Sequence, residues 1–268
     1  MTAFSPRAPI DLDRAREAAG AAYAIEVVEA APSTNALVAA RARAGAPEGL
    51  VVVAEHQTAG RGRLDRTWWT PPRAALTFSV LLRPGPEPVD WPWLPLLTGV
   101  SVAQALRESG AEVALKWPND VLVGGRKVAG LLAERVETPA GPAAVLGIGL
   151  NVSTTRAELP VESATSLMLA GVALDRTDLL VGLLASLRRE YDAWRGPQGV
   201  PRLHAAYTGL CSTVGRRVRV DLPAGHTLLG TAVAVAEGGG LVVDTGARRV
   251  TVGAGDVVHV RPVTESLP

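Results

Sequence analysis

Short runs of apolar residues recur along the first 152 residues, and they predict β-strands. The run 50–54 is apolar throughout and contains three valines, which is typical of a strand buried on both faces. Gly124 and Gly125 separate two of the runs and indicate a tight turn. The predicted strands are residues 25–30, 50–54, 75–82, 113–117, 121–123, 128–136 and 143–152.

Segments of helix-forming residues lie between these strands and after them. Ser33 stands where an N-cap belongs, before a run of strong helix formers that Gly45 closes. Because helices and strands interleave, the sequence predicts an α/β or α+β fold. The predicted helices are residues 11–22, 36–44, 93–109, 176–194 and 202–207.

Beyond Cys211 the chain changes to short β segments separated by turns that contain glycine or proline. About fifty residues of this kind predict a small β-barrel appended to the main domain. We therefore expect two domains, residues 1–210 and 211–268. The five predicted strands of the second domain are residues 217–221, 228–236, 241–244, 248–252 and 257–260.

The composition fits a globular protein and excludes several classes. The chain has 268 residues, 47% of them hydrophobic, and 27 basic against 26 acidic side chains give a formal net charge of +1. A protein whose main work is coating nucleic acid usually has a clear basic excess. The longest uncharged stretches contain proline and glycine, so none predicts a membrane span. A single cysteine excludes an intramolecular disulfide framework. With no secretory signal visible, we expect a cytoplasmic protein.

Two residue types are scarce enough to indicate where chemistry selected them. The chain has only two lysines, Lys116 and Lys127, against 25 arginines. Asparagine occurs only at positions 35, 119 and 151. Both lysines and one asparagine fall in the segment 116–127, where the chain reads KWPND and then KVAG. A compact ammonium can follow charge that moves during a reaction, so function is favoured over a structural hairpin here.

Residues 55–73 show neither the helical nor the strand period of apolar residues, so they are predicted to form a loop. Such long loops in a compact domain are often functional. The stretch reads QTAGRGR and continues to Arg66 and Trp68. Glycines let backbone N–H groups approach an anion, arginines bind phosphate or carboxylate oxygens, and tryptophan can cover a flat ring. A solvated loop and a segment that binds single-stranded nucleic acid are the alternatives.

Two further motifs are weaker when taken alone. Ser33, Thr34 and Asn35 open a predicted helix, where free N–H groups can bind a small polar group, although plain capping explains them as well. The sequence GIGLN ends the strand 143–152, and its alternating glycines indicate close approach of a backbone or a ligand.

Taken together and in this order, STN, QTAGRGR, KWPND with KVAG, and GIGLN closely resemble the motifs of the biotin protein ligase family. The resemblance covers roughly residues 32–151. It implies a mixed-sheet catalytic domain of the biotin/lipoate ligase type, followed by a small SH3-like β-barrel. The family attaches biotin to a lysine of a carrier domain.

The resemblance also assigns roles by position. It implies that Lys127, Lys116 and Arg63 are catalytic. It implies that ATP is bound by Arg63, Arg66, Trp68, Asn119 and Asn151. After GRGR the sequence departs from many members, with Leu64 and Asp65 in place of small or basic residues. The residues implied to bind biotin are Ser33, Thr34, Asn35, Gln57, Arg61, Gly62, Arg63 and Lys127.

The implied reaction joins two anions, because the carboxylate of biotin attacks the α-phosphate of ATP and gives biotinyl-AMP and pyrophosphate. Mg²⁺ and the basic side chains would supply the cations. The partner is then a biotin carboxyl carrier domain of acetyl-CoA carboxylase or another biotin-dependent carboxylase. About 30 residues precede Ser33, fewer than a helix-turn-helix domain needs, so we expect no specific DNA binding. The metal ligands are not indicated.

Two other functions remain open from the residues. A lipoate-attaching enzyme shares the catalytic architecture, although GRGR with KWPND favours biotin. A non-catalytic module that binds single strands through the Gly/Arg loop and the tryptophans is a rival from another class, but the balanced charge and the lysine pair count against it.

Overall fold

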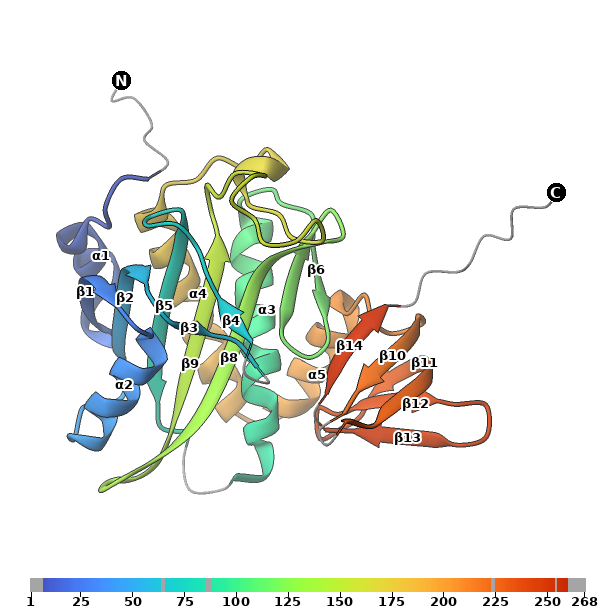
Figure 1. The fold of residues 1–268 in the computed structure, drawn as a ribbon. Coiled ribbons are helices and arrows are strands. Elements are labelled where there is room, and N and C mark those ends of the chain that lie inside the picture. Colours follow the sequence, from blue (N-terminus) through green and yellow to red (C-terminus); the bar gives the residue numbers. More distant parts are fainter. Residues whose placement is uncertain (1–6, 64–65, 85–87, 223–224, 254, 260–268) are drawn as a thin grey trace.

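A computed structural model describes residues 7–63, 66–84, 88–222, 225–253 and 255–259. At its centre is a seven-stranded sheet in the order β1-β2-β5-β9-β8-β7-β6 (Figure 1). The β1–β2 pair is parallel and the other pairs are antiparallel, so the predicted mixed sheet is confirmed. Its strands are β1 (Ala24–Ala31), β2 (Leu50–Gln57), β5 (Ala75–Leu82), β6 (Val113–Lys116), β7 (Asp120–Val123), β8 (Arg126–Thr138) and β9 (Gly141–Asn151).

Helices cover both faces of this sheet (Figure 1). Helix α2 (Thr34–Arg43) packs on β2, β5, β8 and β9, while α3 (Leu94–Glu108) packs on the opposite face and against α4 (Arg176–Arg195). None of the described helices is long and apolar enough to cross a membrane. The remaining helical elements are α1 (Leu12–Ala19), η1 (Gly20–Ala22), η2 (Pro88–Trp93), η3 (Met168–Ala170) and α5 (Gly199–Leu210).

The C-terminal strands form a separate antiparallel sheet in the order β13-β12-β11-β10-β14, as expected for an SH3-like unit. The two sheets are joined by side chains of the first unit, since the indole N–H groups of Trp93 and Trp117 donate to the backbone oxygens of Glu237 and Gly239 at 2.8 and 3.0 Å. The strands are β10 (Arg217–Asp221), β11 (Thr227–Val235), β12 (Leu241–Asp244), β13 (Arg249–Val252) and β14 (Asp256–His259).

Three local predictions can be compared with the structure. The predicted helix 11–22 is interrupted at Gly20, which takes a φ of +59° and ends α1. The predicted turn is confirmed, because Gly124 and Gly125 have φ values of +56° and +73°, as a type I′ hairpin requires. The prediction that residues 55–73 form a loop without regular structure is wrong in part. Strand β2 continues to Gln57, and β3 (Gly60–Arg61) pairs with β4 (Thr67–Trp68) as a short ribbon.

The sheet face beneath α2 changes character along its strands. Under the helix it carries apolar side chains, among them Leu81, Val136 and Val145, which pack against Val38. Past the first turn of the helix the same face carries small or polar residues instead. Because side chains of positions i and i+2 share a face, these are Thr77 and Ser79 on β5, Gly147 and Gly149 on β9, and Gly130 and Glu134 on β8, with the apolar Leu132 between the last two.

A buried ion pair fixes the N-terminal segment to the sheet. Arg176 Nη2 lies 2.5 Å from Glu55 Oε2, and the two side chains are only 2% and 3% exposed. Glu55 Oε1 also accepts the N–H of Ile10 at 2.7 Å, and Arg176 donates to the backbone oxygen of Ala8 at 3.1 Å. Strand β2, helix α4 and residues 8–10 are therefore held at one point.

Replacing Arg176 by Met should leave the Glu55 carboxylate buried without its counter-ion, and we expect a loss of about 3–5 kcal/mol in the free energy of unfolding. Urea titration followed by circular dichroism measures it. The double variant Arg176→Met with Glu55→Gln should recover part of the loss, because no charge is then buried. A loss below about 1 kcal/mol in the single variant would contradict this role of the pair.

Candidate active site

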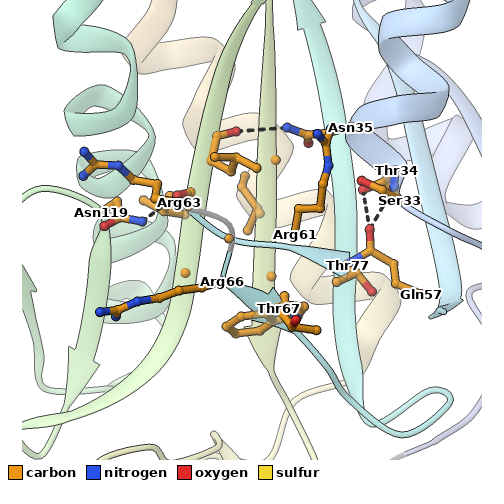
Figure 2. Close-up of a pocket in the computed structure, with 18 of the residues that line it drawn as sticks. Ser33, Thr34, Asn35, Gln57, Arg61, Arg63, Arg66, Thr67, Thr77 and Asn119 are labelled. Carbon is orange, nitrogen blue, oxygen red and sulfur yellow. Dashed lines mark hydrogen bonds between the residues drawn. The ribbon is translucent and has the colours of Figure 1, made fainter. Parts of the chain in front are cut away.

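A pocket of about 130 Å³ lies where the first turn of α2, the small-residue face of the sheet and the β3–β4 ribbon meet (Figure 2). It gathers nearly all of the site residues predicted from the sequence. Those that line it are Ser33, Thr34, Asn35, Gln57, Arg61, Gly62, Arg63, Arg66, Trp68, Asn119 and Lys127.

The start of α2 supplies one wall of the pocket. Ser33 occupies the N-cap position, but its side chain makes no capping hydrogen bond, so plain capping does not account for this serine. The N–H of Thr34 donates to Gln57 Oε1 at 2.8 Å, which joins α2 to the end of β2 (Figure 2). Asn35 is 3% exposed and donates to the carboxylate of Glu134 at 2.6 Å. This wall therefore consists of polar groups held in fixed positions.

Glycines on β8 and β9 form the floor. A Cβ at position 147 would lie 2.2 Å from Asn35 Oδ1, and one at position 149 would lie 2.5 Å from Cε2 of Trp68. Gly149 is paired across the sheet with Gly130. The GIGLN motif predicts close approach at its glycines. This prediction is confirmed, because the side chains of Asn35 and Trp68 lie against Gly147 and Gly149.

The β3–β4 ribbon crosses the mouth of the pocket (Figure 2). The indole of Trp68 lies against Gly149, and its Nε1 is buried without a hydrogen-bond partner among the described residues. Arg61 forms an ion pair with Glu134 at 3.2 Å, and Arg63 and Arg66 line the cavity. Leu64 and Asp65, where the sequence departs from the family pattern, lie outside the described residues.

The two lysines lie on either side of one carboxylate. Lys127 Nζ is 2.5 Å from Asp120 Oδ1, and Lys116 Nζ is 3.8 Å from Asp120 Oδ2. Lys127 also lies 5.9 Å above the ring of Trp68. Asp120 therefore holds two cations at one edge of the pocket, where they would stabilise developing negative charge.

Two predicted residues lie away from the pocket lining. Lys116 is not among the described residues that line the pocket, but it pairs with Asp120, which is. Asn151 is 5% exposed, and its side-chain amide donates to the backbone oxygen of Thr165 at 3.0 Å. In this structure Asn151 fixes the segment that follows β9.

Sequence reasoning missed several polar residues at this site. Thr77, Ser79 and Glu134 extend the polar face on β5 and β8. Hydroxyls at alternate positions of the otherwise apolar run 75–82 were a usable signal for the first two. Within the described ranges, no three His, Cys, Asp or Glu side chains form a metal-binding group.

A buried hydroxyl just before the C-terminal sheet also contacts the lysine hairpin. Thr213 Oγ1 accepts the N–H of Trp117 at 3.0 Å and lies 3.1 Å from His259 Nε2. Burial, together with the cations Lys116 and Arg216, lowers the pKa of His259 from 6.5 to about 4, although Asp120 opposes the shift. His259 is therefore neutral near pH 7.

The sequence matches the family described as the biotin/lipoate A/B protein ligase family over residues 27–151, and the biotin protein ligase C terminal domain over residues 213–260. It is 45% identical over 244 residues to the biotin–[acetyl-CoA-carboxylase] ligase of Mycobacterium tuberculosis, which covers 88% of this chain and 89% of that protein.

Two solved structures are similar over 88% of this chain and 98% of theirs. One is a biotin protein ligase from Aquifex aeolicus in complex with biotin and ATP, with a TM-score of 0.74 and 28% identity. The other is a biotin protein ligase from Leishmania major in complex with biotinyl-5-AMP, with a TM-score of 0.57 and 26% identity.

The depressed pKa of His259 predicts an acid-dependent loss of stability. The unfolded chain takes up a proton near pH 6.5 and the folded chain only near pH 4, so stability should fall as the pH drops through this window. His259→Gln cannot be protonated and should flatten that part of the pH profile of the thermal midpoint. His226→Gln, at an exposed position before β11, is the control. Equal slopes in wild type and His259→Gln would refute the assignment.

Proposed function

Since this chain belongs to the biotin protein ligase family, we propose that it activates biotin with ATP and transfers it to a carrier lysine. In the first step a carboxylate oxygen of biotin attacks the α-phosphorus of ATP, and pyrophosphate leaves. In the second the lysine amine attacks the acyl carbon of biotinyl-5′-AMP, an amide forms, and AMP leaves. The observation that carries the proposal is the pocket in which the STN, QTAGRGR, KVAG and glycine motifs meet.

The pocket divides into two regions of different chemistry. The end formed by Ser33, Thr34, Asn35 and Gln57 is polar but carries no net charge, which suits the uncharged ring system of biotin. The cations lie toward the β3–β4 ribbon and the lysine hairpin, where the carboxylate and phosphates would meet. The residues proposed for biotin are therefore these four with Arg61, Gly62, Arg63 and Lys127.

The nucleotide is proposed to lie beside the cations of the ribbon. Arg63, Arg66 and Asn119 line the cavity there, and Trp68 offers a flat face for the adenine ring. Asn151, buried behind the pocket, would act by fixing the chain after β9. Among the described residues that line the pocket, Asp120 is the one carboxylate, and it already contacts both lysines, so Mg²⁺ would be held mainly by phosphate oxygens and water.

Lys127 and Lys116, with Arg63, are proposed to be the catalytic cations. Lys127 faces the cavity and is the better placed to contact the oxygen transferred from biotin to phosphorus. Lys116, on the far side of Asp120, would add positive potential without direct contact. No protein nucleophile is needed in either step.

The partner is proposed to be the biotin carboxyl carrier domain of acetyl-CoA carboxylase or of another biotin-dependent carboxylase, as the name of the Mycobacterium tuberculosis relative suggests. We further propose a cytoplasmic protein that binds neither membranes nor specific DNA. Retention of an operator duplex in a gel-shift assay at physiological salt would refute the last point.

We also propose residues 1–210 and 211–268 as the two domains. Helix α5 ends at Leu210, and regular structure beyond it is β-sheet. The boundary is tightly packed, since the N–H of Ser212 donates to the backbone oxygen of Leu115 at 2.7 Å.

The defining test is incubation of the purified protein with ATP, Mg²⁺ and either biotin or lipoate. Pyrophosphate release and labelling of a carrier domain should occur with biotin. Labelling with lipoate alone would replace biotin by lipoate as the substrate, and no turnover with either acid would refute a ligase function.

Lys127→Ala should lower the rate of biotin-dependent pyrophosphate release by about 100-fold or more, because a cation that meets the charge of the transition state is lost. The thermal midpoint should stay close to that of the wild type, since the Lys127 side chain is 34% exposed. Lys127→Arg keeps the charge and serves as the matched variant, with an intermediate rate expected. Wild-type rates in Lys127→Ala would contradict the role.

A further inference from the structure

Lys127 lies on β8 just before the part of that strand that pairs with β9. The pairing of β8 with β9 begins at Ala129, two residues after Lys127. A segment from further along the chain bonds to the lysine backbone instead. The N–H of Lys127 donates to the backbone oxygen of Ser163, and its own backbone oxygen accepts the N–H of Thr165, both at 2.8 Å. Residues 163–165 therefore continue the sheet beside Lys127.

A buried side chain holds this segment against the end of β9. Asn151 Nδ2 donates to the backbone oxygen of Thr165 at 3.0 Å, and the backbone oxygen of Asn151 accepts the N–H of Leu167, also at 3.0 Å. Because a carbonyl oxygen can only accept, the NH₂ group of Asn151 must face Thr165. The two residues are 5% and 4% exposed, so bulk water does not replace the donor for Thr165 if Asn151 is lost.

Thr165 thus connects Asn151 to Lys127. Its N–H bonds to the lysine and its carbonyl oxygen bonds to the asparagine. The ammonium group of Lys127 is held separately, by Asp120 Oδ1 at 2.5 Å. The carboxylate restricts where the ammonium can lie, whereas residues 163–165 fix the backbone from which the side chain extends. A shift of that backbone would move the ammonium relative to the substrate even while it stays paired with Asp120.

We propose that Asn151 is a positioning residue that acts through Thr165 to place Lys127, and that it does not contact the nucleotide. The inference rests on the proposed function, because the reaction that Lys127 serves is the activation of biotin by ATP. It departs from the ATP-binding role that the family resemblance implies for Asn151. It also agrees with the set of described residues that line the pocket, which does not include Asn151.

Two substitutions remove the donor. Asn151→Ala shortens the side chain, while Asn151→Asp keeps its shape, and agreement between them excludes an effect of the new charge. We expect the kcat of biotin-dependent pyrophosphate release to fall about tenfold in both, because a displacement of about 1 Å at a reacting group can cost up to about 100-fold. The KM for ATP should stay within about twofold, since no contact with the nucleotide is lost. Glu162→Gln, at an exposed position beside the same segment, is the matched control and should keep the wild-type kcat.

A double-mutant cycle tests whether Asn151 acts through Lys127. In the Lys127→Ala background, Asn151→Ala should lower kcat no further, because the group that it positions is gone. Thermal unfolding verifies that each variant folds.

A third variant loosens the same segment from an exposed position. Arg156 Nη1 donates to the backbone oxygen of Ala164 at 3.1 Å, and Arg156→Gln removes this bond. It should lower kcat about threefold in the wild type and leave it unchanged in the Lys127→Ala background. This pair of measurements decides the question even if the buried variants do not fold.

A raised KM for ATP with an unchanged kcat would overturn the inference, because Asn151 would then bind the nucleotide directly. Wild-type values of both constants, or losses that multiply in the double variant, would overturn it as well. In each of these cases the ligase function stands. If the wild-type protein releases no pyrophosphate with biotin, the proposed function fails and the role of Asn151 fails with it.

Discussion

The site depends on the absence of side chains at two neighbouring positions in one row of the sheet. Thr77 pairs with Gly149, Gly149 with Gly130, and Gly130 with Asp120, so a small hydroxyl, two glycines and a carboxylate lie in register across four strands. A cavity opens there because the backbone itself is the surface. Two residues away along β9, the side chain of Asn35 covers Gly147 on the same face of the sheet. A methyl group at Gly147 or Gly149 would occupy space that Asn35 or Trp68 already fills.

The charged edge of the pocket follows from the same register. Lys116 is the pairing partner of Asp120, and Lys127 approaches the same carboxylate from β8. Two ammonium groups placed side by side would repel, and the carboxylate between them reduces that cost. The cations are therefore in place before an anionic substrate enters, so little reorganisation accompanies the reaction. The formal net charge of +1 for the whole chain gives no indication of this local concentration of positive charge.

The sequence alone predicts most of the fold because its hydrophobic periods are strong and its turns use glycine where φ is positive. The strands of the main sheet and the helices α2 to α5 are predicted to within a few residues. The order of the motifs, through the resemblance it carries, also predicts that Thr34, Gln57 and Lys127 belong to one site. The β3–β4 ribbon could not be predicted, since two-residue strands have no period. Ser79 and Glu134 owe their importance to partners far along the chain, and no local pattern reports such contacts. Asp120, in contrast, pairs with the two lysines of the segment 116–127 that the sequence singles out. Asn151 belongs to the motif, but it is not among the residues that line the cavity, and its side-chain amide donates to the backbone oxygen of Thr165.

The β3–β4 ribbon has a consequence for the exchange of bound molecules. Among the described residues its two strands pair at two positions, Gly60 with Trp68 and Arg61 with Thr67, whereas the floor beneath it belongs to the long β8–β9 hairpin at the centre of the sheet. Segments with few contacts open at much lower free energy than the global unfolding reaction. Separating the two strands of the ribbon would therefore cost less free energy than unfolding the floor. Substitutions in the ribbon should then change the residence time of a bound molecule more than they change the conformational stability.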